Sequence, residues 1–203
     1  MGGVAGASGE GPQLTGWAFS SATISADSVG FSAVVVWLTQ PAAAVRPAVA
    51  DTRSAVRRRA LAPLVRQRLG LDADPTLIAG PDGVRRLIAP GWFASVAERH
   101  GWVAAVIAPA PVGIDVETVA EAERSREVIL ADATVDDLAA WHGLAGVWAA
   151  REAVLKAVGR DLTRDPGGWR FVAGYATATG IAAHRVDLVT RATVVAAVAY
   201  AGS

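Results

Sequence analysis

The sequence predicts a mixed fold of the α/β (α+β) class, in which two pseudo-symmetric halves each pack a helix on an antiparallel sheet. Runs of β-branched and aromatic residues, which are typical of strands, alternate with segments whose apolar residues recur at helical spacing. The composition, with 52% hydrophobic and 19% charged residues over 203 positions, is that of a globular protein large enough to bury a core. We expect a loose tail at residues 1–14, a first half at 15–111 and a second half at 112–203.

The first half is expected to begin with two strands and to continue into a basic helix. The strand-like runs cover residues 17–24 and 31–38, and turn-forming residues separate them. A helix is predicted from about residue 51 to 69, because its apolar residues recur at helical spacing and Gly70 can end it. A strand at 102–108 follows before the boundary.

The second half is expected to alternate strands with helices. After a strand at 112–117, Thr118 and Glu121 fit a capping box that begins a helix. A second helix is predicted to begin at Thr134, and a third spans 144–158, where apolar residues again recur at helical spacing. Three further strand-like runs follow, at 168–174, 181–189 and 193–201.

Charge and composition exclude several classes of function. The 19 basic and 19 acidic residues give a net charge of 0, so nucleic acid and anionic membranes are not expected partners. The chain has no cysteine and no apolar run near the ~20 residues that span a bilayer, and we expect a cytoplasmic protein. Residues 1–100 hold 10 basic and 7 acidic residues, whereas 101–203 hold 9 and 12. A basic half beside an acidic half suits an anionic ligand bound together with a divalent cation.

The first motif that carries chemistry is Gly-Ile-Asp-Val-Glu at residues 113–117. In a strand, Asp115 and Glu117 project to one side and the two β-branched residues to the other. Two carboxylates this close repel each other unless water or a cation separates their charges. Taken alone, the pattern also fits a solvated strand edge.

The second motif runs from Trp148 to Lys156 and contains the only lysine of the chain. On a helix, Trp148, Glu152 and Lys156 stack on one face, at spacings of four residues. Taken alone, the pattern also fits a surface ion pair. Together the two motifs supply three carboxylates and one ammonium group, which is the composition of a site for magnesium and a phosphate.

Both motifs resemble the signatures of the Sfp-type 4′-phosphopantetheinyl transferases. The first signature, G-[IV]-D-[IV]-E, is intact at 113–117, and the second, W-x-x-[KR]-E-[AS]-x-x-K, is intact at 148–156. The resemblance implies that fold, with coenzyme A bound between the halves of a monomer. It also implies transfer of the phosphopantetheine arm to a serine of an acyl or peptidyl carrier protein, with release of 3′,5′-ADP. Such carriers serve polyketide, nonribosomal peptide or fatty-acid synthesis.

The resemblance also implies roles for individual residues. Asp115, Glu117 and Glu152 would hold Mg²⁺ against the pyrophosphate of coenzyme A. Glu152, directly or through a water molecule, would take the proton of the incoming serine, and Lys156 would assist the departing phosphate and contact coenzyme A. Other residues that match coenzyme A contacts of the family are Arg57, Gly83, Arg85, Arg86 and His100.

Two positions depart from the family pattern. The Ser-His pair, whose histidine contacts a phosphate, corresponds to Ala97 and Glu98, and a carboxylate there repels phosphate. Either Arg99 or His100 replaces the histidine, or coenzyme A binds more weakly. The G-[KR]-P motif on the adenine side keeps Gly83 but lacks the proline.

These departures leave three functions open. The leading one is an active, Mg²⁺-dependent 4′-phosphopantetheinyl transferase of the holo-[acyl-carrier-protein] synthase type. The second is an impaired or repurposed member that binds coenzyme A or a carrier protein without transfer. The third is another Mg²⁺-dependent enzyme on the same scaffold that acts on a small nucleotide-like substrate.

Overall fold

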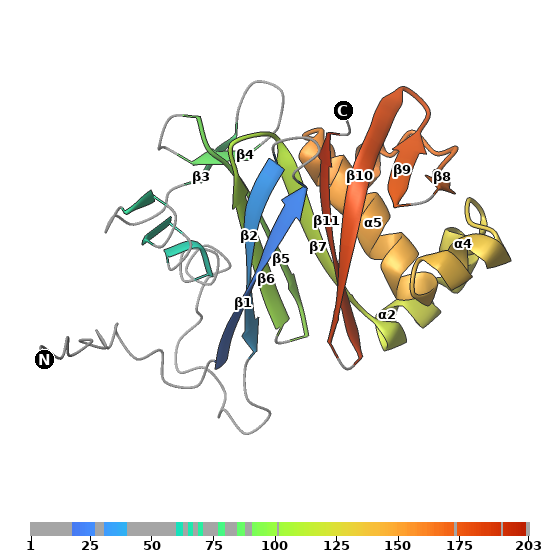
Figure 1. Ribbon diagram of the computed structural model, residues 1–203. Helices are drawn as coiled ribbons and strands as arrows, with labels where there is room; N and C mark the ends of the chain where they lie inside the picture. Colours follow the sequence, from blue (N-terminus) through green and yellow to red (C-terminus); the bar gives the residue numbers. More distant parts are fainter. Residues whose placement is uncertain are drawn as a thin grey trace, which may run out of the picture.

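The structure is a computed structural model. The residues that it describes form two β-sheets and the helices that pack on them (Figure 1). For the first four strands only the backbone is described. The described segments are residues 18–26, 31–39, 60–62, 65–66, 69–70, 77–79, 85–87, 91–100, 102–172, 174–191 and 193–201.

The first sheet is antiparallel and has six strands in the order β1-β2-β6-β5-β4-β3. Strands β5 and β6 pair up to Arg99 and Trp102, and His100, which follows β5, has a φ of 46°. The strands are β1 (Ala18–Ala26), β2 (Phe31–Thr39), β3 (Leu77–Ala79), β4 (Arg85–Leu87), β5 (Phe93–Arg99) and β6 (Trp102–Ala108).

The second sheet is also antiparallel and has five strands in the order β7-β11-β10-β9-β8. Strand β7 is therefore an edge strand that pairs only with β11 within this sheet. The strands are β7 (Val112–Thr118), β8 (Arg170–Val172), β9 (Tyr175–Ala178), β10 (Ile181–Arg191) and β11 (Val194–Ala201).

Helix α5 (Gly143–Ala157) crosses one face of the second sheet, and shorter helices lie around its first turns (Figure 1). Five of the buried residues of α5 are alanines, whose small side chains allow the helix to approach the sheet closely. The shorter elements are α2 (Val119–Arg124), α3 (Arg126–Leu130), α4 (Val135–Ala140) and the 3₁₀ helix η2 (Leu162–Arg164).

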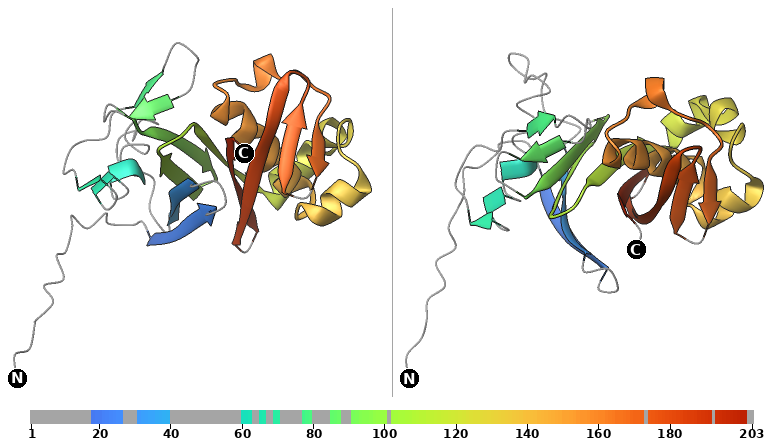
Figure 2. Two further views of the ribbon diagram at one scale, coloured as in Figure 1. Left: turned by 45° about the horizontal axis from the view of Figure 1, so that its top comes forward. Right: turned by 90° about the horizontal axis from the view of Figure 1, so that it is seen from above.

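The two sheets pack against each other, so the molecule is layered as helix, sheet, sheet, helix (Figure 2). One apolar cluster lies between the sheets and joins Val106 of β6 to Ile114 of β7 and Val198 of β11. A second fills the space between the second sheet and α5, and a third includes Ala60, Leu61 and Val65. Strand β7 thus stands where the sheets meet.

The predicted mixture of helix and antiparallel sheet is confirmed. Gly70 has a φ of +64° and its N–H bonds to the carbonyl of Arg66, as expected for the residue that ends a helix. Thr118 accepts a hydrogen bond from the N–H of Glu121, and Thr134 begins α4 with a full capping box. The side chain of Glu121 does not complete the first box, because it bonds to His100 and Arg124 instead.

Strands β3, β4, β5 and β9 were not predicted. The sequence of β5 consists mainly of small and charged residues, and its place in the sheet depends on pairing with β6. Tertiary pairing here overrides weak local propensity.

Candidate functional site

The site is built where the edge strand β7 meets helix α5. Ile114 and Val116 point into the core between the sheets, whereas Gly113, Asp115 and Glu117 lie on the side of α5. A Cβ at Gly113 would lie 1.9 Å from the carbonyl oxygen of Ala153. The glycine of the first motif therefore lets the strand and the helix approach closely enough for their side chains to share one site.

Three carboxylates converge in this space. Asp115 and Glu117 extend from β7 and Glu152 from α5, and one oxygen of each lies within 4.8 Å of the others. Asp115 is only 3% exposed and Glu117 only 1% exposed. The solvated strand edge is therefore excluded, since both acids are buried.

Lys156 lies one helical turn after Glu152 and points to the same strand. Its Nζ donates to Oδ1 of Asp115 at 2.5 Å and to the carbonyl oxygen of Ile114 at 3.2 Å. On the first sheet, Ser95 accepts a hydrogen bond from the N–H of Ile114 at 3.1 Å. The outward backbone groups of the edge strand are thus held by residues from both halves.

Arg99 supplies a second cation from the end of β5. Its Nη2 donates to Oε1 of Glu117 in a short ion pair. The next residue, His100, bonds through Nε2 to Glu121 at the start of α2. The turn between β5 and β6 is therefore tied to the second half at two successive residues.

The pKa values of all three carboxyl groups are raised. Burial, followed by the charge of Asp115, raises the pKa of Glu117 to about 7, although Arg99 opposes the shift. The same two causes raise the pKa of Glu152 to about 7. Burial also raises the pKa of Asp115 against the opposing effect of Lys156. Arg99 and Lys156 supply two positive charges against three acids, of which Asp115 and Glu117 are buried and Glu152 is half-buried.

A divalent cation fits this arrangement. Oδ2 of Asp115 is buried and has no hydrogen-bond partner among the described residues. An unpaired buried carboxylate oxygen is costly, and a cation relieves that cost. The donors are all oxygens, which Mg²⁺ prefers, and three carboxylates leave coordination positions open for phosphate and water.

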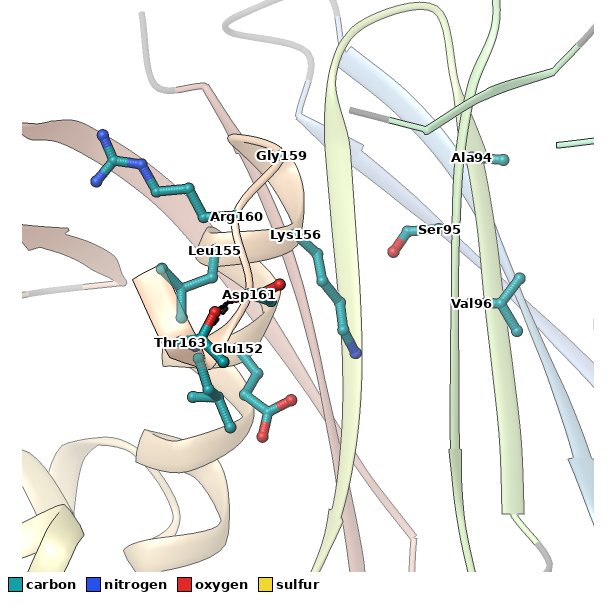
Figure 3. Close-up of a pocket in the computed structure, with 11 residues that line it drawn as sticks. Ala94, Ser95, Val96, Glu152, Leu155, Lys156, Gly159, Arg160, Asp161 and Thr163 are labelled. Carbon is teal, nitrogen blue, oxygen red and sulfur yellow. Dashed lines mark hydrogen bonds between the residues drawn. The ribbon is translucent and has the colours of Figure 1, made fainter. Parts of the chain in front are cut away.

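A pocket of about 500 Å³ lies beside the carboxylates, between β5 and the end of α5 (Figure 3). Glu152 and Lys156 extend from α5 toward β7, and Ser95 lies on β5 across from them. Residues 159–163, which follow α5 and lie on its side of the pocket, also line it. The site therefore has room for a ligand next to its acids and its ammonium group.

Arg151, the neighbour of Glu152, fixes the helix from the opposite side. Its Nε donates to Asp165 at 2.5 Å and its Nη1 to Asp132 at 3.3 Å. Its guanidinium carbon also lies 5.1 Å from the ring centroid of Trp148 and 5.7 Å from that of Trp169. Only 12% of its side chain is exposed. Arg151 is thus part of the framework that orients α5.

The other sequence-predicted residues have different outcomes. Glu98 is exposed, and it lies on the face of β5 opposite to Ala97 and Arg99, so it does not join the acidic cluster. His100 contacts Glu121 rather than the pocket. Arg57 and Gly83 lie outside the described residues, and of Arg85 and Arg86 only the backbone is described.

Sequence reasoning missed the contact of Arg99 with Glu117 and the contact of Ser95 with Ile114. Ser95, Ala97 and Arg99 alternate at strand spacing and place small or polar groups on one face. That period of two, followed in the sequence by the pair His-Gly, is the signal that could have indicated a strand facing β7.

Residues 111–193 match the family model of the 4′-phosphopantetheinyl transferase superfamily. Comparison with curated protein sequences gives no significant match. In the part of the chain that the structure describes, no helix has the length and apolar character needed to cross a membrane. The matched segment holds both motifs, the three carboxylates and Lys156. Residues 111–193, with the site that they hold, are thus similar to the 4′-phosphopantetheinyl transferase superfamily.

Proposed function

We propose that the chain transfers the 4′-phosphopantetheine arm of coenzyme A to a serine of an acyl or peptidyl carrier protein and releases 3′,5′-ADP. The bond that forms joins the serine oxygen to the phosphorus of the arm. The bond that breaks is the pyrophosphate P–O bond of coenzyme A. We propose that the protein acts as a monomer of the Sfp type, with coenzyme A held between residues 15–111 and the catalytic half at 112–203.

Three side chains would hold the metal ion of this reaction. Asp115, Glu117 and Glu152 bring their oxygens close together, and Oδ2 of Asp115, which has no hydrogen-bond partner among the described residues, would be one of the ligands. Mg²⁺ bound there would neutralise the charge of the pyrophosphate.

Glu152 would act on the incoming serine and Lys156 on the departing phosphate. Glu152 borders the pocket and would accept the serine proton, directly or through a water molecule. Lys156 also borders the pocket, and 32% of its side chain is exposed, so its Nζ can leave Asp115 for an oxygen of the departing phosphate. Its charge would stabilise the developing negative charge on 3′,5′-ADP.

The observation that carries the proposal is the convergence of three acids and one ammonium group beside a pocket of about 500 Å³. The test mixes the protein with coenzyme A, Mg²⁺ and an apo carrier protein, and weighs the carrier by mass spectrometry. We expect the mass of one phosphopantetheine to be added, and Glu152→Gln and Lys156→Met to slow this addition at least 100-fold. Val135→Ala, at a residue that is 78% exposed, is the control variant and should transfer at the rate of the parent. No added mass on several carriers at equimolar protein would reject the activity.

Binding without transfer is the second candidate. It is favoured by Glu98, whose exposed carboxylate occupies the place of a phosphate-binding histidine in the family. Calorimetry with coenzyme A separates the two functions, because an inert binder shows affinity without changing the mass of the carrier. In that case Glu98→His should produce transfer.

A further inference from the structure

Arg99 makes a contact that the proposed transfer does not use. The guanidinium group bonds to Glu117, which is also one of the three acids that would hold the cation. Lys156 bonds in the same way to Asp115. Two of the three acids are therefore already held by cations of the chain itself.

The arginine is placed by the fold rather than by chance contact. It ends β5, and His100 after it adopts a left-handed conformation with a φ of 46° and bonds to Glu121. Ser95, four residues earlier on the same strand, is fixed to Ile114. The strand is thus anchored to the second half on both sides of Arg99, and the guanidinium group is held against the acidic cluster.

The contact is incomplete in a way that points to a further ligand. Among the residues that the structure describes, neither the buried Nε of Arg99 nor the buried Oδ2 of Asp115 has a hydrogen-bond partner. The site therefore contains one hydrogen-bond donor, on the guanidinium group, and one acceptor, on the carboxylate, that are not used. A cation entering the cluster completes the coordination of Asp115, and an anion arriving with it offers an acceptor to Arg99.

Charge indicates which contacts can coexist. Three carboxylates with Arg99 and Lys156 carry a formal charge of −1, and a divalent cation changes this to +1. Arg99 and the metal ion then repel each other across Glu117, in surroundings where few charges are screened by water. An anion such as pyrophosphate would offset the excess positive charge.

We propose that Arg99 is the resident counter-ion of Glu117, that a divalent cation competes with it for this carboxylate, and that the guanidinium group then helps to hold a pyrophosphate that arrives with the metal. Arg99 is in this account a positioning residue that sets the order of binding. It disfavours the bare metal ion and favours the metal together with its anion. The inference rests on the metal site of the proposed function.

The test measures binding and not turnover. Mn²⁺ is titrated calorimetrically into the whole protein, first alone and then with inorganic pyrophosphate, for the parent and for Arg99→Gln. The glutamine keeps an amide donor for Glu117 but removes the charge. We expect the variant to bind Mn²⁺ alone at least tenfold more tightly. We also expect pyrophosphate to strengthen Mn²⁺ binding to the parent at least tenfold more than to the variant.

Two controls define the effect. Arg99→Lys keeps the charge, and we expect its affinity for Mn²⁺ to stay within about threefold of the parent. Arg124→Gln removes an arginine from the exposed neighbouring pair with Glu121 and should change neither titration. Should Arg99→Gln fail to fold, the side-chain ¹⁵N resonances of Arg99 in the parent serve instead, and they should shift when diamagnetic Mg²⁺ is added.

The possible results separate the inference from the proposed function. If the parent binds Mn²⁺ and Arg99→Gln binds it equally or less tightly, Arg99 is only a structural tie and the inference is wrong. If the parent binds Mg²⁺ but the side-chain resonances of Arg99 do not shift, the inference is also wrong. If the parent binds no Mn²⁺ in either titration, the metal site of the proposed function fails, and the inference fails with it.

Discussion

Replacing Gly113 by alanine tests the close approach of strand β7 and helix α5. The added Cβ would lie 1.9 Å from the carbonyl oxygen of Ala153, whereas an ordinary contact is at least 3.4 Å. The helix must therefore move outward by about 1.5 Å, which is the difference between the two distances. Because the clash is with backbone, no side-chain rotation relieves it. We expect a loss of about 3 kcal/mol in the free energy of unfolding, the upper part of the range for overpacking.

Urea denaturation followed by circular dichroism measures this loss, and the melting temperature should fall by roughly 6–12 °C for a chain of this size. The same shift should separate Lys156 from Asp115 and weaken Mn²⁺ binding at least tenfold. Gly146→Ala is the matched control, since its Cβ would lie 1.6 Å from the carbonyl oxygen of Trp141, at the far end of α5 from Lys156. It should destabilise the protein similarly but retain metal affinity in the folded fraction. A Gly113→Ala protein within 0.5 kcal/mol of the parent would refute the packing argument.

Two further predictions concern charge. Because the pKa values of Glu117 and Glu152 are raised to about 7 in the folded state, the metal-free fold retains protons that the unfolded chain has already released. Its free energy of unfolding, measured with urea in a chelator, should therefore fall as the pH rises from about 4.5 to about 7, by up to about 3 kcal/mol for Glu117. The double variant Glu117→Gln/Glu152→Gln should lack this fall, and an equal slope in parent and variant would contradict the assignment. Arg151→Met removes the ion pairs of Asp132 and Asp165, although Asp165 keeps its bonds from Gly167 and Trp169, and should cost about 3 kcal/mol by denaturation. Arg126→Met, at an exposed pair, should cost less than about 1 kcal/mol. Equal losses in these two variants would show that the buried position of Arg151 does not matter.

The acidic site could be predicted in large part because its geometry is local. The period of two in residues 113–117 puts Asp115 and Glu117 on one side of a strand, and the spacing of four puts Glu152 and Lys156 on one face of a helix. Only the meeting of strand and helix needed further information, and Gly113 is the residue in the sequence that permits it.

The contribution of the first sheet could not be predicted in this way. Arg99 reaches Glu117 only because β5 pairs with β6 and the two sheets pack face to face. Both conditions are tertiary, and the residues of β5 have weak strand propensity. Contacts between segments that no local period relates are therefore the part of the site that required the structure.

The most direct test of the account is to locate the metal ion. Crystals grown with coenzyme A and Mn²⁺ would be measured at the manganese absorption edge. The account predicts one anomalous peak at about 2.0–2.3 Å from oxygens of Asp115, Glu117 and Glu152, with the pyrophosphate of coenzyme A beside it. Coenzyme A bound with no peak among these three carboxylates, or a peak held by other residues, would contradict it.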